Sequence, residues 1–547
     1  MILPAHRPTE SILPWALLGG TLLGLSFPPV PAGLLAAFAF VPLLVALRAI
    51  DGYGRAFRLA WLTFGVFNLV TLYWTGGFVH AKDPYMMVAG GLLLIVHPLF
   101  FTLPVLGWMF LRVHFGFRRA LAAFPFVWIS FEYLHSLTQI AFPWLILGNT
   151  QTYDLAAIQM SSATGVYGVS FWLCVLNVLC FRIYENLVHD RKGMTSAPTL
   201  ALLAAVAVVY VGPKIYGHWV LSGHGGSAGE PVPVRVGVVQ PNIDPFEKWQ
   251  ENGEGQISEL QQLTAKFAER HVDLVIWPET AIPFFILHPN NVSALDRLRR
   301  QVDSMRISLL AGFPDIRYYG DKEIAPKSSK VSRSGQRFDT YNSSLLLEPN
   351  SDLIQKYSKI VLVPFAERVP FSEELSLLNA MEWNFGLGGW EIGSDTTVFS
   401  FRTDRDHEVH FSNLICYESI YPGFVASFVR KGAGFLTVMT NDSWWGNTSG
   451  PYQHVQFAAL RAVENRRWIV QCANGGISCF IDPFGRILKA TPMFTRQTMT
   501  MDVPLHDELT FYTRHGDWFA QACLVLALFA FAAAAGTKLY RVIRSKE

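Results

Sequence analysis

The sequence contains little charge for its length. Only 16% of the 547 residues are Asp, Glu, Lys or Arg, whereas 51% are hydrophobic and the mean hydropathy is +0.27. This balance argues against an ordinary soluble enzyme and indicates several membrane spans. The formal net charge is only +2, so no broad basic field is available to attract nucleic acid. We therefore expect a membrane protein with no nucleic-acid partner.

Cysteine is also scarce, and its spacing lacks the patterns of metal and disulfide sites. No C-x-x-C pair occurs among the six cysteines, which are Cys174, Cys180, Cys416, Cys472, Cys479 and Cys523. Three of them lie inside apolar spans, where a thiol behaves as a small hydrophobic group. The sequence indicates neither a zinc site nor a disulfide framework, and we expect no metal or other cofactor.

Long apolar runs are abundant. A bilayer crossing needs about 17–25 apolar residues, and eight such runs occur, near 12–28, 32–50, 57–78, 87–111, 119–136, 165–184, 199–216 and 517–537. Arg and Lys gather in alternate gaps between these runs, which predicts that those gaps and both termini face the cytoplasm. The first run lacks a small-x-small cleavage site before the next one begins, so we expect an uncleaved span rather than a signal peptide.

The remaining sequence divides around one long polar segment. We predict seven transmembrane helices in 1–216, a linker in 217–232, a domain in 233–512, and an eighth transmembrane helix with a cytoplasmic tail in 513–547. By the charge distribution, the large domain faces outward. Strand-like runs alternate with helix-like runs throughout it, which predicts a layered α/β fold on sheets covered by helices.

Two segments of this domain, 280–289 and 371–390, are too apolar for ordinary exposed loops. One interpretation is that they pack on the domain's own core. The other is that they form arms that dip into the bilayer interface, where aromatic residues are favoured, beside an active site. We predict arms and keep core packing as the alternative.

Three strand-like runs end at reactive side chains: Glu279, Lys359 and Cys416. Each residue alone has an ordinary structural explanation, such as a capping carboxylate, a solvated charge or a buried thiol. Together they supply a base, a cation and a nucleophile, which is what thiol-based acyl transfer requires. The residues after Cys416 predict a strand that turns sharply into a helix. We expect that turn to expose the thiol at a helix N-terminus and to lower its pKa.

The motifs that carry these residues resemble a known superfamily. Trp277-Pro278-Glu279, Tyr357-Ser358-Lys359 and Cys416-Tyr417-Glu418 are similar to the Glu–Lys–Cys signatures of nitrilases. With the membrane spans and the motif at 142–148, the chain resembles the membrane-embedded branch of this superfamily, the apolipoprotein N-acyltransferases. One departure is Ala366, which stands where the family usually has a glycine before the glutamate.

This resemblance implies a fold and a reaction. The fold is a nitrilase-like αββα sandwich inserted before the last of about eight transmembrane helices. In the implied reaction Cys416 is the nucleophile, Glu279 the proton acceptor and Lys359 the oxyanion stabiliser. An acyl chain passes from a phospholipid, with phosphatidylethanolamine as the expected donor, through a Cys thioester to the α-amino group of a diacylglyceryl-cysteine at the apolipoprotein N-terminus. The implied location is the bacterial inner membrane, with the catalytic domain in the periplasm.

Further residues match family positions around this site. Supporting roles near Lys359 or the acyl channel are predicted for Glu367, Glu418 and Tyr417. Substrate binding is predicted, with packing as the alternative, for Trp249, Asn342, Gly148 and Trp444. His454 is predicted to be structural.

Two other functions fit part of the pattern. A membrane-tethered nitrilase-type amidohydrolase would use the same three residues with water as the acceptor. A transporter or membrane scaffold with an outward binding module would instead need charges along a path through the membrane. Glu132 is the main candidate for such a charge, and Glu185 lies near a predicted cytoplasmic end.

Overall fold

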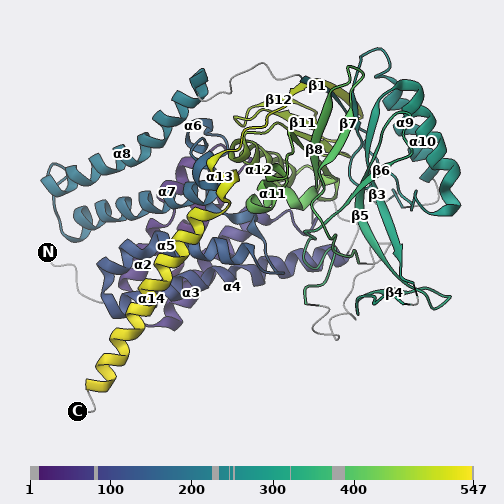
Figure 1. Ribbon diagram of the computed structural model, residues 1–547. Coiled ribbons are helices and arrows are strands. Elements are labelled where there is room, and N and C mark those ends of the chain that lie inside the picture. Colours follow the sequence, from purple (N-terminus) through teal and green to yellow (C-terminus); the bar gives the residue numbers. More distant parts are fainter. Residues whose placement is uncertain are drawn as a thin grey trace.

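The computed structural model describes residues 11–78, 84–224, 233–245, 247–249, 253–320, 322–371 and 389–544. Within them, a bundle of helices lies beside a two-sheet α/β domain (Figure 1). The last helix, shown in yellow, returns from the α/β domain along the bundle.

Each of the eight predicted spans coincides with helical structure. The elements are α1 (Leu13–Leu25), η1 (Gly33–Ala37) with α2 (Val41–Ala49), α3 (Tyr53–Leu72), α4 (Pro84–Phe115), α5 (Phe117–Ser136), α7 (Ser161–Tyr184), α8 (Ala197–Trp219) and α14 (Trp518–Arg544). In the described part of the chain, four helical stretches are long and apolar enough to cross a membrane: Met86–Phe115, Ser161–His189, Ala197–Gly223 and Trp518–Thr537. The total of eight spans stays a prediction.

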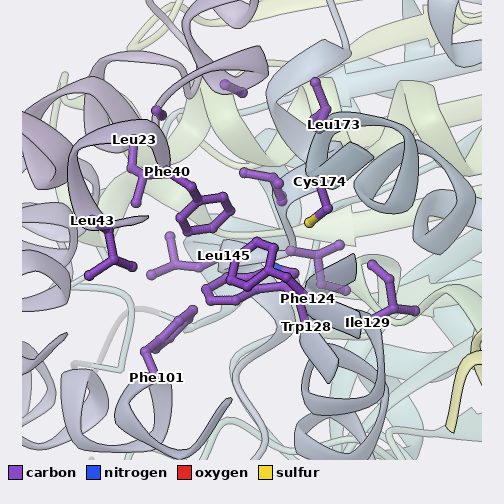
Figure 2. Packing of buried hydrophobic residues seen from close by; sticks show 14 of the residues in the cluster. Leu23, Phe40, Leu43, Phe101, Phe124, Trp128, Ile129, Leu145, Leu173 and Cys174 are labelled. Atoms are coloured by element: carbon purple, nitrogen blue, oxygen red, sulfur yellow. The ribbon is translucent and has the colours of Figure 1, made fainter. Parts of the chain in front are cut away.

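Aromatic packing holds the bundle together. Phe40 and Trp128 lie with ring centroids 4.5 Å apart, and Phe101 packs on the same indole at 6.0 Å (Figure 2). The polar side chain of Asn177 is buried here. Its Oδ1 accepts a bond from the Phe40 N–H at 2.7 Å, and its Nδ2 donates to the Ala36 carbonyl at 2.7 Å. These bonds satisfy main-chain groups at the break between η1 and α2, as an apolar environment requires.

The α/β domain contains two sheets. The seven-stranded sheet has the order β13-β1-β2-β3-β5-β4 with β6 also on β5, where β13 is Gln497–Pro504, β1 Pro233–Gln240, β2 Leu274–Ile276, β3 Ser308–Tyr318, β5 Arg337–Leu347, β4 Lys330–Val331 and β6 Ile354–Ser358. The six-stranded sheet has the order β12-β11-β10-β9-β8-β7, where β12 is Ile487–Ala490, β11 Cys479–Ile481, β10 Ile469–Ala473, β9 Phe435–Thr440, β8 Glu408–Ile415 and β7 Phe399–Arg402.

Side-chain alternation along the strands explains how the layers pack. On β2, Leu274 and Ile276 belong to the core that includes both sheets, whereas Val275 belongs to the core under α9 (Gly253–Ala265) and α10 (Val292–Met305). The six-stranded sheet is covered by α11 (Pro422–Arg430) and α12 (Ser449–Asn465). The predicted αββα sandwich is therefore confirmed.

Two local expectations differ from the structure. Helical structure continues through η5 (Val220–His224), so the first half of the predicted linker is helical, and the second half lies outside the described residues. The arm prediction for 280–289 is wrong, because Ile282 and Ile286 are fully buried in the core under α9 and α10. Of the second predicted arm, 372–388 lies outside the described residues.

The two parts of the molecule share one hydrophobic core. Phe457 and Leu460 of α12 belong to the same buried cluster as the membrane helices. Trp144, in the short helix η2 (Pro143–Leu145), packs on Phe457 with ring centroids 5.3 Å apart. A Cβ on Gly450 of α12 would lie 2.7 Å from the Trp74 ring, so only glycine permits this approach. The α/β domain is thus firmly seated on the helix bundle.

Candidate active site

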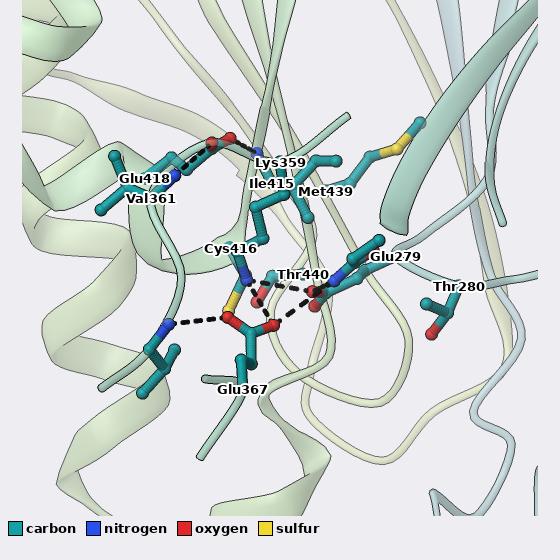
Figure 3. A network of polar contacts seen from close by, with 12 residues as sticks. Glu279, Thr280, Lys359, Val361, Glu367, Ile415, Cys416, Glu418, Met439 and Thr440 are labelled. Carbon is teal, nitrogen blue, oxygen red and sulfur yellow. Dashed lines mark hydrogen bonds and ion pairs between the residues drawn. The ribbon is translucent and has the colours of Figure 1, made fainter. Parts of the chain in front are cut away.

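Strand ends from both sheets bring the three reactive residues together. Glu279 lies just beyond β2, Lys359 directly follows β6, and Cys416 directly follows β8. Figure 3 shows the Glu279 and Glu367 carboxylates and the Cys416 thiol facing a common centre, with dashed lines to both carboxylates from the Lys359 ammonium. Residues 137 positions apart in the chain therefore converge on one small volume, from Glu279 to Cys416 (416 − 279 = 137).

Two carboxylates surround the Lys359 ammonium. Its Nζ lies 2.8 Å from Glu367 Oε1 and 3.5 Å from Glu279 Oε1. Burial opposes the charge, but Glu367 and Glu279 outweigh it and raise the pKa of Lys359. The ammonium is therefore charged at any physiological pH, as an oxyanion stabiliser must be.

Glu367 is held in place despite the alanine before it. Its second oxygen, Oε2, accepts a bond from the Val363 N–H at 2.8 Å. The left-handed backbone conformation in this turn falls on Phe365, with φ of +63°, and not on Ala366. A glycine is therefore not needed at 366 for Glu367 to reach Lys359.

Asn342, on β5, links the two carboxylates. Its Nδ2 donates to Glu279 Oε1 at 2.8 Å and lies 3.4 Å from Glu367 Oε1. Its main-chain carbonyl accepts the Lys359 N–H at 2.8 Å. Sequence reasoning predicted substrate binding for Asn342, and the structure places it in the network that fixes Glu279 and Lys359.

Glu418 joins the turn at Cys416 to the loop after Lys359. Its Oε2 accepts the Ile415 N–H at 2.7 Å, and its Oε1 accepts the Ile360 N–H at 2.7 Å and the Tyr357 hydroxyl at 2.6 Å. Glu418 was predicted to support Lys359, and in the structure it does so by binding the main-chain N–H of the next residue, Ile360. Burial raises the pKa of Glu418 to about 7.

The turn that carries Cys416 is strained and tightly held. Cys416 has φ of +53°, a left-handed conformation that is uncommon in non-glycine residues and is concentrated at functional sites. Its carbonyl accepts bonds from Ser419 Oγ at 2.8 Å and His454 Nε2 at 3.2 Å. His454 is fully buried, and its other ring nitrogen lies 3.0 Å from Asp442. These contacts fit the structural role predicted for His454.

The expected exposed, low-pKa thiol is wrong. Cys416 is 9% exposed, and burial raises the pKa of its thiol well above the usual value. The negative charge of Glu279 acts in the same direction, while Lys359 opposes it. The following helix η8 (Cys416–Ile420) is only one short 3-10 turn, too short to overcome desolvation. The thiol is therefore protonated at rest and needs a base when it attacks.

Tyr417 connects the site to the membrane helices. Its hydroxyl donates to the Ala141 carbonyl at 2.9 Å, and its ring stacks on Phe142 with centroids 6.0 Å apart. Ala141 and Phe142 lie in the loop between α5 and η2. The nucleophile thus lies directly beside the helix bundle, although the predicted acyl-channel role of Tyr417 stays a prediction.

Of the other predicted substrate contacts, Gly148 has a packing role in the structure. A Cβ on Gly148 would lie 2.6 Å from the Val166 carbonyl oxygen, so close packing alone accounts for this glycine. Trp444 is half-buried, beside Trp445, which packs on Trp74 at 4.7 Å. Trp249 is half-buried as well. Substrate binding by Gly148, Trp444 and Trp249 stays a prediction.

Sequence reasoning missed two neighbours of the site. Thr440 hydrogen-bonds the Cys416 thiol and donates to Asp442 at 2.7 Å. Lys248 contacts the main chain of Glu279. Lys248 stands directly before Trp249 and Thr440 lies four residues before Trp444, so both are close in sequence to residues with predicted roles. Nothing in the sequence, however, shows that these side chains turn inward.

The acidic residues of the bundle are engaged in local contacts. Glu132 Oε1 accepts the Trp128 indole N–H and the Leu147 N–H, both at 2.8 Å. Glu185 forms ion pairs with Arg182 and Arg48. Both carboxylates thus have local partners within the bundle.

Comparisons with known proteins agree with this architecture. A model of the carbon-nitrogen hydrolase family matches residues 235–508, and a model of the apolipoprotein N-acyltransferase N-terminal domain matches residues 19–179. Among curated relatives, the apolipoprotein N-acyltransferase of Chlorobaculum tepidum is 38% identical over 94% of this chain and 95% of its own length. The enzyme of that name from Geobacter metallireducens is 33% identical over 94% of both chains. The chain therefore belongs to the apolipoprotein N-acyltransferase family.

Proposed function

We propose that this protein transfers a fatty acyl chain from a phospholipid to the α-amino group of an N-terminal diacylglyceryl-cysteine, through a thioester on Cys416. The observation that carries this proposal is the position of the site. A thiol, a carboxylate and an ammonium meet where the α/β domain contacts the membrane helices, with Tyr417 bonded to the Ala141 carbonyl. An acyl donor in the bilayer lies close to such a nucleophile.

In the first half-reaction, Glu279 takes the proton of the Cys416 thiol as the sulfur attacks the ester carbonyl of the phospholipid. The Lys359 ammonium stabilises the oxyanion of the tetrahedral intermediate. The bond from carbonyl carbon to ester oxygen then breaks, and Glu279 returns the proton to the departing lysophospholipid hydroxyl. A thioester remains on Cys416.

In the second half-reaction, the α-amino group of the lipoprotein attacks the thioester carbonyl. Glu279 accepts a proton from the attacking nitrogen, and Lys359 again stabilises the oxyanion. The carbon–sulfur bond breaks, an amide forms, and the proton returns to the Cys416 sulfur. Phosphatidylethanolamine is the proposed donor, as the resemblance implies.

The proposed location is the bacterial inner membrane, with eight spans, both termini in the cytoplasm and the α/β domain in the periplasm. The alternation of Arg- and Lys-rich gaps supports this orientation. An apolipoprotein carrying a lipidated N-terminus would then meet the site at the outer face of the bilayer.

An amidohydrolase would use the same three side chains, so the acceptor must be tested directly. Purified protein is incubated with phosphatidylethanolamine and a diacylglyceryl-cysteine peptide, and Cys416→Ala serves as the control. We expect an N-acylated peptide from the wild type only. Release of free fatty acid without acylated peptide would favour the hydrolase, and neither product from the wild type would overturn the proposal.

A further inference from the structure

A buried lysine binds the turn that carries Glu279 and Thr280. Lys248 is 1% exposed, and its Nζ donates to the Glu279 main-chain carbonyl at 2.8 Å and to Thr280 Oγ1 at 2.7 Å. Figure 3 shows Thr280 on the far side of Glu279 from Cys416. Two of the three ammonium hydrogens therefore hold two consecutive residues of the catalytic turn.

The turn that Lys248 holds is strained. Thr280 has φ of +46°, and a β-branched residue rarely adopts a left-handed conformation because its Cβ crowds the backbone. Such strain persists only where surrounding contacts over-determine the backbone. Lys248 supplies two of these contacts, one to the carbonyl of the peptide group between Glu279 and Thr280 and one to the Thr280 side chain.

Close packing also fixes this turn. A Cβ on Gly312 of β3 would lie 2.5 Å from the Thr280 nitrogen and 2.9 Å from the Glu279 Cα. The Gly312 carbonyl also accepts the Ile282 N–H at 3.0 Å. The Glu279 main chain is thus held by β3 as well as by Lys248.

Lys248 is itself anchored through its main chain. Its N–H donates to the Asp244 carbonyl at 3.0 Å, and its carbonyl accepts Gln256 Nε2 at 2.9 Å. A buried ammonium without a full carboxylate partner is costly, and burial lowers the pKa of Lys248 to about 7 despite the opposing charge of Glu279. This cost favours a role for the ammonium beyond packing.

We infer that Lys248 is a positioning residue for the reaction: by binding the Glu279 carbonyl and the Thr280 hydroxyl, it holds the strained turn so that the Glu279 carboxylate faces the Cys416 thiol. This inference rests on the proposed function for the role of Glu279 as the base. It assigns Lys248 no contact with substrate.

The test compares Lys248→Met with the wild type. Methionine keeps the length and apolar volume of the side chain but removes its donors and charge. The readout is the rate of Cys416 alkylation by iodoacetamide between pH 5 and 9, followed by peptide mass spectrometry, which needs no lipid substrate. We expect a roughly 10–100-fold slower reaction at neutral pH, the scale of a misplaced catalytic group. Exposed Lys266, changed to Met, is the matched control and should react as the wild type does.

The pH profile separates positioning from a general loss of structure. The titratable groups around Glu279 are Lys359, Cys416, Lys248, His454 and, through Asn342, Glu367. Burial lowers the pKa of Lys248 to about 7, so its charge is lost within the range tested, and the wild-type profile should contain a step near pH 7 that is absent in Lys248→Met. If Lys248 were merely structural, both proteins would have the same profile, and the variant would only react faster as it unfolds.

A second variant tests the strain. Glycine adopts a positive φ without cost, so Thr280→Gly should need Lys248 less, and the double variant Lys248→Met/Thr280→Gly should recover part of the lost rate. Wild-type alkylation rate and pH profile in Lys248→Met would overturn the inference. Phospholipid-dependent acylation of Cys416 is measured in parallel. Its absence in the wild type would count against the proposed function, while the alkylation result would still decide the role of Lys248.

Discussion

The two sheets contribute different chemistry to the site. Ends of the seven-stranded sheet and their loops carry ionised groups that balance one another, with Lys359 between Glu279 and Glu367. The six-stranded sheet instead carries an uncharged thiol on a strained turn, supported by Thr440 and by the Cys416 carbonyl contacts. The ionised groups thus come from one sheet and the nucleophile from the other, and they meet where the strands end. Changes on each side should have separable effects.

The largest effect is expected on the nucleophile side. Cys416→Ala removes the atom that forms the thioester and should lower acyl transfer by about 10⁴-fold or more, as loss of a catalytic nucleophile does. The measurement is product formation with a diacylglyceryl-cysteine peptide. Loss of one buried sulfur atom leaves only a small cavity, so the loss of thermal stability should be modest. Substantial remaining transfer in this variant would show that another group is the nucleophile.

On the ionic side, Lys359→Met and Glu279→Gln should each lower transfer by roughly 10²–10³-fold, the usual range for an oxyanion donor or a general base. The matched control is Lys356→Met, because Lys356 lies on the same strand, β6, with its side chain 53% exposed and paired with Asp315. Its rate should stay near that of the wild type. Equal losses in the control and in Lys359→Met would point to a general effect of strand β6.

Sequence patterns predicted the parts of this arrangement that are encoded locally. Strand-like runs that end near Glu279, Lys359 and Cys416 predicted these three residues as the site, and each of them follows a strand in the structure. The apolar segment 280–289 was assigned to the bilayer because composition does not distinguish a lipid-facing side chain from one buried under α9. The sequence also did not predict the raised pKa of the Cys416 thiol or the inward orientation of the Lys248 side chain. Both depend on contacts with residues that are distant in the sequence.

Glu418 joins the two sides, because it bonds Tyr357 of β6 and Ile415 of β8. Both carboxylate oxygens of Glu418 accept hydrogen bonds, so in Glu418→Gln the amide NH₂ would face a hydrogen-bond donor. One buried donor would then lose its hydrogen bond, at a cost of about 1–3 kcal/mol. We expect a lower melting temperature in detergent and slower thioester formation. An unchanged melting temperature would show that the two sheets do not depend on this carboxylate.

The same residue predicts a pH dependence of stability. The pKa of Glu418 is about 7 in the folded protein, above the pKa of an ordinary glutamate. Protonation of Glu418 therefore stabilises the fold fully at pH values below the ordinary glutamate pKa, and this stabilisation is lost as the pH rises through 7. The difference in melting temperature between wild type and Glu418→Gln should therefore narrow from pH 5 to pH 8. A difference in melting temperature that widens from pH 5 to pH 8 would contradict the predicted direction of the pH effect.

The thiol itself offers a further test of the comparison. Because its pKa is raised, Cys416 should show no thiolate absorbance at 240 nm at pH 7. The signal is obtained as the difference between wild type and Cys416→Ala, and it should appear only at pH values above the ordinary range of a cysteine. Thiolate at pH 7 would mean that the ionic side activates the nucleophile before substrate binds.

The smallest effect is expected where the site meets the bundle. Tyr417→Phe removes the hydrogen bond to the Ala141 carbonyl but keeps the ring on Phe142, and should cost about 0.5–1.5 kcal/mol of stability. Tyr421→Phe is the matched control, since its hydroxyl reaches the same carbonyl at 3.2 Å. Thermal-shift measurements of both variants compare their losses of melting temperature. A larger loss in Tyr421→Phe would show that Tyr421, and not Tyr417, makes the main contact with the Ala141 carbonyl.

The central claim is that the Cys416 sulfur receives an acyl group from a phospholipid in the bilayer beside it. Intact-mass analysis of the full chain after incubation with phosphatidylethanolamine of defined acyl chains tests it most directly. The account predicts one added acyl mass that hydroxylamine removes and that is absent in Cys416→Ala. No adduct on the wild type, or the same adduct on Cys416→Ala, would contradict it.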